Sequence, residues 1–309
     1  MTQQPTRLLV VGGNGFIGRH IVNHGMGLGW DVTSLNLSLR PGGEVNSQGV
    51  RHVAADIANR DALKEALEEA SFEYVVNCGG YIDHTLFFSG GRNIFDIHFE
   101  GVLNLVEILN RNVLQAFVNV GSSDEYGNNP APQIETQREA PISPYSMGKV
   151  AATHFLQMLY RTEKFPATIL RLFLTYGPGQ DKRRFLPQII SGCLEGRSFP
   201  TSEGQQLRDF CFVQDTVAAV FAAFDCPAAR GEVINIGSGQ PVSIRQMIET
   251  VKRLVGAGIP KFGAVAYRPG ENMSLFADIG KAKVLLEWAP KVTLEQGLEQ
   301  TIQWFKARA

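Results

Sequence analysis

The chain alternates short apolar runs with longer segments whose apolar residues recur at helical spacing. The first apolar run is RLLVV at residues 7–11, and a glycine-rich loop and a helical segment at 19–26 follow it. Further strands are predicted by apolar runs at 31–37, 52–57, 74–77, 117–120 and 168–176. Helices are predicted between them at 61–70, 94–110 and 145–160. This alternation predicts an α/β fold with a doubly wound parallel sheet of the Rossmann type.

Beyond residue 176 the pattern is more irregular. A strand followed by a loop is predicted at 233–239, and a helix at 243–255 with Ser243 as its cap. Two closing helices are predicted at 281–288 and 294–305. We therefore expect the C-terminal part of the chain to be organised differently from the regular alternation that precedes it.

The composition is that of an ordinary globular protein, with 309 residues of which 44% are hydrophobic and 19% charged. A formal net charge of −1 gives no electrostatic reason to expect nucleic acid or an anionic membrane as a partner. No apolar run reaches the roughly 20 residues of a membrane span, and residues 1–7 are too polar for a signal peptide. The four cysteines form no CxxC pair, so we expect a reducing, cytoplasmic location.

A glycine loop stands between the first strand and the first helix, which is the context that a dinucleotide-binding fingerprint requires. Its glycines are spaced one residue more widely in the first gap than in G-x-G-x-x-G. The start of the helix offers free N–H groups to a pyrophosphate. The candidate cofactor-binding residues of the loop are Gly12, Asn14, Gly15, Phe16 and Ile17.

The end of the second strand bears on the choice of cofactor. NAD-binding folds place an acid here to bind the ribose, but this chain has Asn36, with Arg40 just beyond. Without a repelling carboxylate, and with an arginine that can pair with a phosphate, NADP(H) is favoured over NAD(H). Asp56 and Ile57 after the third strand, and Gly79 and Gly80 after the fourth, are the other candidate cofactor contacts.

Tyr145 and Lys149 are four residues apart at the start of a predicted helix, so they share one face. An ammonium beside a phenol favours the phenolate, which predicts a tyrosine tuned for proton transfer. Ser122 follows the fifth strand and completes a hydroxyl, phenol and ammonium set. Ser123 and Asp124 follow directly and are further candidate catalytic residues.

Several residues are candidates for substrate binding. Arginines near turns can hold a diphosphate, although each also fits an ordinary surface position. His84 lies in an irregular loop expected over the site, and Ser123 is a candidate contact as well as a catalytic one. The remaining candidates are Leu174, Arg184, Arg208 and Arg268. No metal site is expected, because Ile21 and Val22 stand between His20 and His24 where a zinc protease carries its base.

These residues together resemble the extended short-chain dehydrogenase/reductase family, in the branch that acts on nucleotide sugars. The motifs that carry the resemblance are Gly12-x-x-Gly15-Phe16-Ile17-Gly18, Asp56, Ser122, Tyr145-x-x-x-Lys149, Arg171-Leu-Phe, Tyr176-Gly-Pro-Gly-Gln180, Arg208-Asp-Phe, Asp215, Arg268-Pro-Gly-Glu and Ala277-Asp-Ile. The resemblance implies an NAD(P)-binding Rossmann domain at 1–170 and a smaller nucleotide-sugar-binding domain at 171–309, with some chain crossing back. It also implies Ser122, Tyr145 and Lys149 as the catalytic set, and a homodimer formed through the helices at 94–110 and 145–160.

The departures from the family leave the reaction open. Ungapped alignment with the sugar 4,6-dehydratases of the family puts Asp124 where their base stands, whereas a one-residue shift makes Asp124 and Glu125 the acid pair. Leu174 replaces the family's usual asparagine.

Our first hypothesis is a reductase that uses NADPH on the 4-keto group of an NDP-4-keto-6-deoxyhexose. The alternative is a 4-epimerase or 4,6-dehydratase that retains NAD, and the third is a non-catalytic cofactor-binding member.

Overall fold

The central sheet is built from seven parallel strands in the order β10-β6-β5-β4-β1-β2-β3. The computed structural model describes residues 5–38, 49–68, 70–268 and 270–308. The strands of this sheet are β1 (Arg7–Val11), β2 (Asp31–Asn36), β3 (Arg51–Ala54), β4 (Tyr74–Asn77), β5 (Ala116–Ser122), β6 (Ala167–Leu172) and β10 (Val233–Ile236). Because all of them are parallel, their carboxyl ends lie along one edge of the sheet. The predicted doubly wound α/β fold is confirmed.

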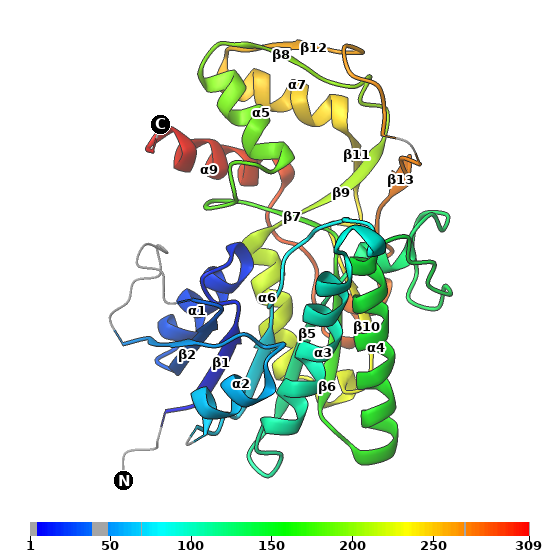
Figure 1. The fold of residues 1–309 in the computed structure, drawn as a ribbon. Helices are drawn as coiled ribbons and strands as arrows, with labels where there is room; N and C mark the ends of the chain where they lie inside the picture. The colour runs from blue at the N-terminus through cyan, green and yellow to red at the C-terminus, as the bar shows by residue number, and fades with distance from the viewer. Residues whose placement is uncertain (1–4, 39–48, 69, 269, 309) are drawn as a thin grey trace.

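Helices cover both faces of the central sheet (Figure 1). In β1, Leu8 and Val10 belong to the core on one face, and Leu9 and Val11 to the core on the other. Burial on both faces explains why these strands are continuous apolar runs. The first core includes α1 (Phe16–Gly27), α6 (Val213–Phe224) and the short α8 (Gly280–Leu285). The second includes α2 (Arg60–Leu67), α3 (Arg92–Ile108) and α4 (Pro144–Glu163).

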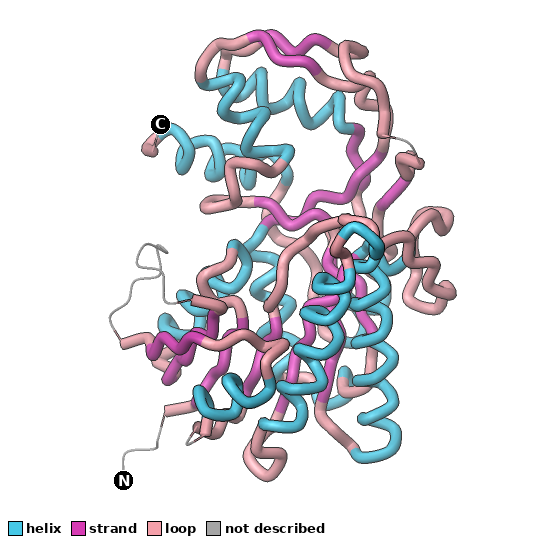
Figure 2. The backbone as a smooth tube through the Cα atoms, in the orientation of Figure 1, coloured by secondary structure: helices cyan, strands magenta, loops and turns pink. Residues whose placement is uncertain are grey.

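A smaller part of the molecule has its own strands and its own core (Figure 2). Its main sheet has the order β11-β9-β13, and a further strand, β7, also pairs with β9. These strands are β7 (Leu174–Tyr176), β9 (Leu207–Phe212), β11 (Pro241–Ser243) and β13 (Ser274–Leu275). The pair β8 (Ser198–Pro200) and β12 (Ile259–Lys261) stands apart. The helices of this part are α5 (Phe185–Leu194), α7 (Ile244–Val255) and α9 (Leu294–Lys306).

The predicted strand at 168–176 is wrong as a single element. The structure divides it at Phe173, so that β6 pairs with β5 and β10, whereas β7 pairs with β9 in the smaller part. The apolar run gives no sign of this break because it continues through it, although β6 is fully buried whereas β7 begins with the exposed Leu174. The predicted strand at 52–57 also ends early, at Ala54, which leaves Asp56 in a turn where its carboxylate accepts a hydrogen bond from the Ala58 N–H.

The chain crosses between the two parts repeatedly. After β7, α5 and β9 it returns to the central layer as α6 and β10, and it then leaves again for β11 and α7. The strand β10 extends the central sheet beside β6, although it lies well beyond residue 170. The predicted return of the chain from the smaller part to the central sheet therefore involves both a helix, α6, and a strand, β10. The division of the chain into a cofactor domain and a nucleotide-sugar domain stays a prediction.

Candidate active site

The glycine loop leaves the carboxyl end of β1 in a form that only glycine fits. Gly12 has φ of +76°, and a Cβ added to it would lie 2.8 Å from the carbonyl oxygen of Cys78. A Cβ on Gly18 would lie 2.2 Å from the carbonyl oxygen of Gly12, so this glycine lets α1 pack directly on the loop. By contrast, a Cβ on Gly15 would meet only one atom, at 3.0 Å. The loop is therefore tight toward the protein and open around Gly15.

The first turn of α1 is ready to bind an anion. Its N-cap, Gly15, gives no side-chain hydrogen bond, and the first turn contains no acid. By contrast, Asn59, Ser143, Ser243 and Thr293 cap α2, α4, α7 and α9 with their side chains. Unpartnered N–H groups and the positive end of the helix dipole fit a pyrophosphate. The residues present thus fit a dinucleotide.

Asn36 supports the glycine loop from β2. Its side-chain oxygen accepts a hydrogen bond from the Asn14 N–H at 2.8 Å, and its amide donates to the Ser34 hydroxyl at 3.0 Å. The side chain is largely buried. Asn36 therefore supports the structure of the glycine loop, in addition to being a candidate cofactor contact. Arg40, the other basis for the NADP(H) prediction, lies outside the described residues.

The remaining cofactor candidates lie after β3 and β4. Asp56 is exposed, whereas Ile57 is buried and its carbonyl accepts a hydrogen bond from the Asn104 amide at 2.8 Å. Gly79 is held by the side chain of Asn77, which accepts from its N–H at 3.0 Å. Gly80 has φ of +89°, and a Cβ on it would lie 2.3 Å from the ring of His98. Since β4 neighbours β1, these glycines lie beside the loop at Gly12.

The start of α4 positions Tyr145 and Lys149. Ser143 caps the helix in a reciprocal pair with Ser146, and Pro144 occupies the first turn, as its missing N–H allows. Tyr145 and Lys149 are 4% and 5% exposed. The Lys149 ammonium lies 6.0 Å from the centre of the Tyr145 ring and donates a hydrogen bond to the carbonyl oxygen of Val120 at 2.7 Å. The predicted shared face is therefore present.

The expected lowering of the Tyr145 pKa is not found. Burial raises the pKa of Tyr145, the nearby Asp124 carboxylate raises it further, and a hydrogen bond with Ser122 opposes the rise. Burial also lowers the pKa of Lys149 to about 8, which weakens the charge that was expected to stabilise a phenolate. The correction has a simple cause. Spacing shows that two groups meet, but it does not show how much water they lose.

The segment after β5 separates two acids that are adjacent in sequence. Ser122 accepts a hydrogen bond from the Asp124 N–H at 3.1 Å, and Ser123 is buried. The Asp124 carboxylate lies 3.6 Å from the imidazole of His84, at the site. Glu125 is fully buried and accepts a hydrogen bond from the Ser122 N–H at 2.9 Å. Asp124 therefore faces His84, whereas Glu125 is turned into the core, and the choice between the two alignments stays open.

Glu125 belongs to what we call the buried ion cluster, made of Glu125, Glu139, Thr153 and Arg171. The Arg171 guanidinium donates to Glu125 at 2.9 Å and to Glu139 at 2.6 Å, and the Thr153 hydroxyl donates to Glu125 at 2.9 Å. Arg171 has no exposed surface and also lies over the ring of Tyr126. Burial alone would lower the pKa of Arg171, but Glu125 and its other partners raise it.

Three of the substrate candidates converge on Asp124. The charges of His84, Arg208 and Arg184 all oppose the effect of burial, which raises the pKa of Asp124. Arg208 is anchored by an ion pair with Glu271. Leu174 is 40% exposed at the start of β7, and Arg268 is exposed in a turn with Glu271. No contact in the described part of the chain joins these last two to Asp124.

One residue at the site was missed. His98 on α3 packs edge-on against Tyr145, with ring centres 4.9 Å apart, and its Nε2 lies 3.0 Å from the carbonyl oxygen of Tyr81. Burial, with help from the Lys149 charge, lowers the pKa of His98 to about 3, so the ring is neutral. The sequence feature that could have identified His98 is its position on the buried face of a predicted helix, three residues before Gly101.

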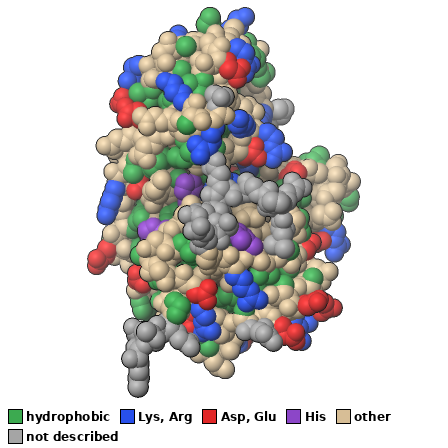
Figure 3. Space-filling view, turned by 90° about the vertical axis from the view of Figure 1, so that its left-hand side faces the viewer, with side chains coloured by type: hydrophobic (Ala, Val, Ile, Leu, Met, Phe, Trp, Pro, Cys, Tyr) green, Lys and Arg blue, Asp and Glu red, His purple; other side chains and the backbone are tan. Residues whose placement is uncertain are grey.

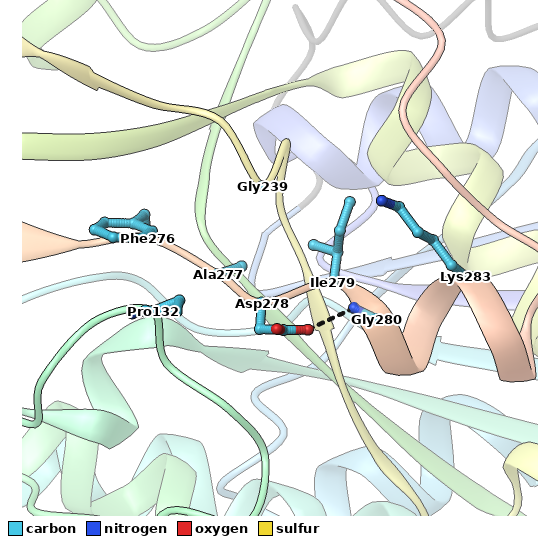
Figure 4. Close-up of a pocket in the computed structure, with 8 residues that line it drawn as sticks. All are labelled: Pro132, Gly239, Phe276, Ala277, Asp278, Ile279, Gly280 and Lys283. Atoms are coloured by element: carbon cyan, nitrogen blue, oxygen red, sulfur yellow. Dashed lines mark hydrogen bonds between the residues drawn. The ribbon is translucent and has the colours of Figure 1, made fainter.

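The cavity in Figure 4 lies elsewhere. It has a volume of about 330 Å³ and is lined by residues that include Pro132, Asp278 and Lys283, with none of the candidate site residues among them. The Asp278 carboxylate in its wall accepts a hydrogen bond from the Gly280 N–H at 2.7 Å. We assign it no part in the chemistry.

The surface charge, the helices, the potential metal ligands and the cysteines identify no second functional site among the described residues. On the face shown in Figure 3, the coloured acidic and basic side chains are interspersed. Within the described ranges, no helix has the length and apolar character of a membrane span. No group of three or more potential metal ligands is found among the same residues. All four cysteines are free thiols.

Fold and site together define an NAD(P)-binding α/β enzyme. The model of the NAD dependent epimerase/dehydratase family matches residues 8–237, and the chain belongs to this family. The family resemblance seen in the sequence is thereby confirmed.

Relatives include both reaction types. A dTDP-glucose 4,6-dehydratase of Haemophilus influenzae is 25% identical, covering 96% of this chain and 97% of the relative. A putative UDP-glucose 4-epimerase of Methanocaldococcus jannaschii is 28% identical, covering 97% and 98%. Among solved structures, a UDP-glucose 4-epimerase of Thermotoga maritima with UDP-glucose has a TM-score of 0.90 and 26% identity, covering 98% and 99%.

Proposed function

We propose that this chain binds NAD and a nucleotide-diphosphate hexose, oxidises C4 of the sugar and returns the hydride to the same sugar. This is the chemistry shared by 4-epimerases and 4,6-dehydratases. The observation that carries the proposal is the set of Ser122, Tyr145 and Lys149, at the carboxyl edge of the sheet beside a glycine loop that fits a dinucleotide. The names of the relatives favour this reaction over the NADPH-dependent reductase of our first hypothesis.

In this proposal each residue of the set has one task. Bound NAD would supply the hydride acceptor. Tyr145, as the phenolate, takes the proton of the C4 hydroxyl; in an epimerase it gives the proton back when C4 is reduced again, whereas in a dehydratase the C4 ketone remains. Ser122 holds the sugar oxygen, and Lys149 holds the cofactor ribose and supplies positive charge close to Tyr145. The raised pKa of Tyr145 means that this step needs the additional positive charge that a bound cofactor brings.

The diphosphate is assigned to the arginines that face the site from the smaller part. Arg208 is mostly buried and fixed by Glu271, and Arg184 stands at the start of α5. A guanidinium anchored in this way is pre-oriented for a phosphate oxygen. Leu174 and Arg268 are retained as candidate contacts of the same substrate.

Asp124 favours the dehydratase within this pair of reactions. A 4-epimerase needs no acid beyond the tyrosine, whereas a dehydratase needs a base for the carbon next to C4. Asp124 provides a carboxylate beside Tyr145, since its charge raises the pKa of that phenol. We assign Asp124 that role, with Ser123 next to it.

A reductase stays as the second candidate because of Asn36. This residue puts an amide where a carboxylate would repel a 2′-phosphate, so NADP(H) is not excluded from the site. A reductase would consume NADPH in proportion to the 4-keto sugar supplied, whereas the proposed enzyme recycles its cofactor.

The test begins with the purified protein. We expect denaturation to release NAD(H), and UDP-glucose or dTDP-glucose to reduce the bound cofactor transiently. Mass spectrometry of the sugar then separates the outcomes, because dehydration removes one water and epimerisation leaves the mass unchanged. Stoichiometric NADPH consumption with a 4-keto sugar, and no reaction without it, would replace the proposal by the reductase.

Two further proposals concern the whole molecule. The helices α3 and α4 pack side by side, and Met147 and Met158 are exposed on α4, which supports a homodimer through this helix pair. The free thiols support a reducing compartment such as the cytoplasm.

A further inference from the structure

Asp124 and Glu125 differ in how their carboxylates are used. The Glu125 carboxylate accepts hydrogen bonds from Ser122, Thr153 and Arg171 and is fully buried, so it is held inside the core. Within the described ranges, the Asp124 carboxylate accepts no hydrogen bond, and its single ion-pair contact is with His84. The exposed fractions of the two side chains are 30% for Asp124 and 53% for His84. The Asp124 carboxylate therefore has His84 as its one ion-pair contact, while the charges of Arg184, Arg208 and Glu125 and the phenol of Tyr145 lie near enough to interact with it.

The loop that carries His84 is built to present it. Asp83 accepts hydrogen bonds from the Thr85 N–H at 2.7 Å and the Thr85 hydroxyl at 2.6 Å, which closes a tight turn around His84. The imidazole then lies edge-on to Tyr145, with ring centres 5.8 Å apart. Its Nε2 is 3.6 Å from Asp124 Oδ2, an ion-pair distance that a small closure converts into a hydrogen bond.

We propose that His84 is the proton partner of Asp124 and that the two exchange a proton between solvent and a carbon next to C4 of the bound sugar. The proposal rests on the proposed function, because it needs a ketone at C4. The Asp124 carboxylate removes the proton of C3 or C5. The electron pair of that C–H bond forms the C=C bond of an enolate, whose oxygen receives hydrogen bonds from Tyr145 and Ser122.

The step requires a neutral His84 that carries its one proton on Nδ1. The proton on Asp124 then passes to the unprotonated Nε2, which restores the carboxylate and leaves an imidazolium. No oxidant or reductant takes part in this step. Since His84 is half exposed, its proton exchanges with water, and the reverse sequence returns a solvent proton to the carbon. His84 acts through Asp124 and is a positioning and relay residue.

The test supplies the ketone directly, so that it does not depend on oxidation at C4. The holoenzyme is incubated in D₂O with UDP-4-keto-6-deoxyglucose or its dTDP analogue, and NMR follows deuterium uptake at C3 and C5. We expect wild type to exchange one position well above the rate in buffer. Asp124→Asn and His84→Ala should lower this rate at least tenfold, with little change in the Kd of the sugar. Added imidazole should restore the rate of His84→Ala but not that of Asp124→Asn.

A matched control is His154→Gln. His154 is also about half exposed and lies 3.2 Å from a carboxylate, that of Glu139, but it has no contact with Tyr145. This variant should exchange deuterium like wild type. Exchange no faster than in buffer, or an undiminished rate in His84→Ala, would overturn the proposal. Failure of the separate cofactor-reduction test with UDP-glucose or dTDP-glucose, while exchange persists, would overturn the proposed redox cycle alone.

Discussion

Two regions share the short segment after β5 and use their charges in opposite ways. On one side, Ser122, Asp124, Tyr145 and Lys149 form the proposed catalytic face, on which burial shifts the pKa of every titratable group. On the other side, the buried ion cluster joins Arg171 to Glu125 and Glu139 by direct hydrogen bonds. A buried, paired charge makes the loss of either partner costly to the fold, whereas a buried charge that is only partly paired has a pKa shifted from its ordinary value. The two regions should therefore respond oppositely to mutation.

The largest effect is expected on the catalytic face. Tyr145→Phe should lower turnover by about 100- to 10,000-fold, because it removes the proton that C4 chemistry requires. The unfolding midpoint should change little, since the phenol hydroxyl takes no part in the core. Steady-state kinetics and thermal unfolding would measure both effects, and Tyr160→Phe on the same helix is the matched control. Near-normal turnover in Tyr145→Phe would refute its assigned role.

The buried ion cluster should show the reverse pattern. Arg171→Met leaves the Glu125 and Glu139 carboxylates without their buried partner, and we expect unfolding to become easier by about 3–5 kcal/mol. Urea unfolding would measure this loss. Arg183→Met removes an arginine that is also paired with an acid but is 89% exposed, and it should leave the free energy of unfolding nearly unchanged. Equal losses in the two variants would contradict the distinction between the regions.

Lys149→Met sharpens the comparison, because it should abolish activity and yet stabilise the fold. The pKa of Lys149 falls from 10.5 to about 8, which corresponds to a penalty of about 3 kcal/mol below pH 8. Loss of the hydrogen bond to Val120 offsets about 1–2 kcal/mol of the gain. Between pH 8 and 10.5 the unfolded chain binds more protons, so wild-type stability rises with pH and the advantage of the variant shrinks. Urea unfolding at pH 7 and pH 10 would test this.

The smallest effect concerns His98 below neutral pH. Its pKa is lowered to about 3 from 6.5, so the unfolded chain holds a proton that the folded chain lacks between these values. The stability is complete above pH 6.5 and falls by up to about 1.4 kcal/mol per pH unit below it. His98→Gln should reduce that slope, whereas His154→Gln should not. Unfolding curves at pH 7, 6 and 5 that are parallel for wild type and His98→Gln would contradict this account.

The sequence predicted what depends on local order along the chain. The strand at 74–77, the start of a helix at Ser243 and the glycine loop follow from periodicity, capping and backbone freedom, all of which are local. Three features depend on the surroundings of a segment and could not be predicted from the sequence. These are the break at Phe173, the opposite orientations of Asp124 and Glu125, and the raised pKa of Tyr145. Each is decided by which distant residues, such as Arg171 or Ile236, pack against the segment.

The repeated crossing of the chain also limits how this protein can be divided. A fragment that ends near residue 170 would keep the whole glycine loop and the tyrosine, yet it would lack α6 and β10. One face of the central sheet would then keep α1 but lose α6 and α8, and what remains of β6 would become an apolar edge open to other chains. Exchanging substrate preference between relatives by joining halves at that point should therefore yield aggregates. To exchange substrate preference between relatives, one would instead transfer separate surface segments, such as the loop with His84 and the start of α5.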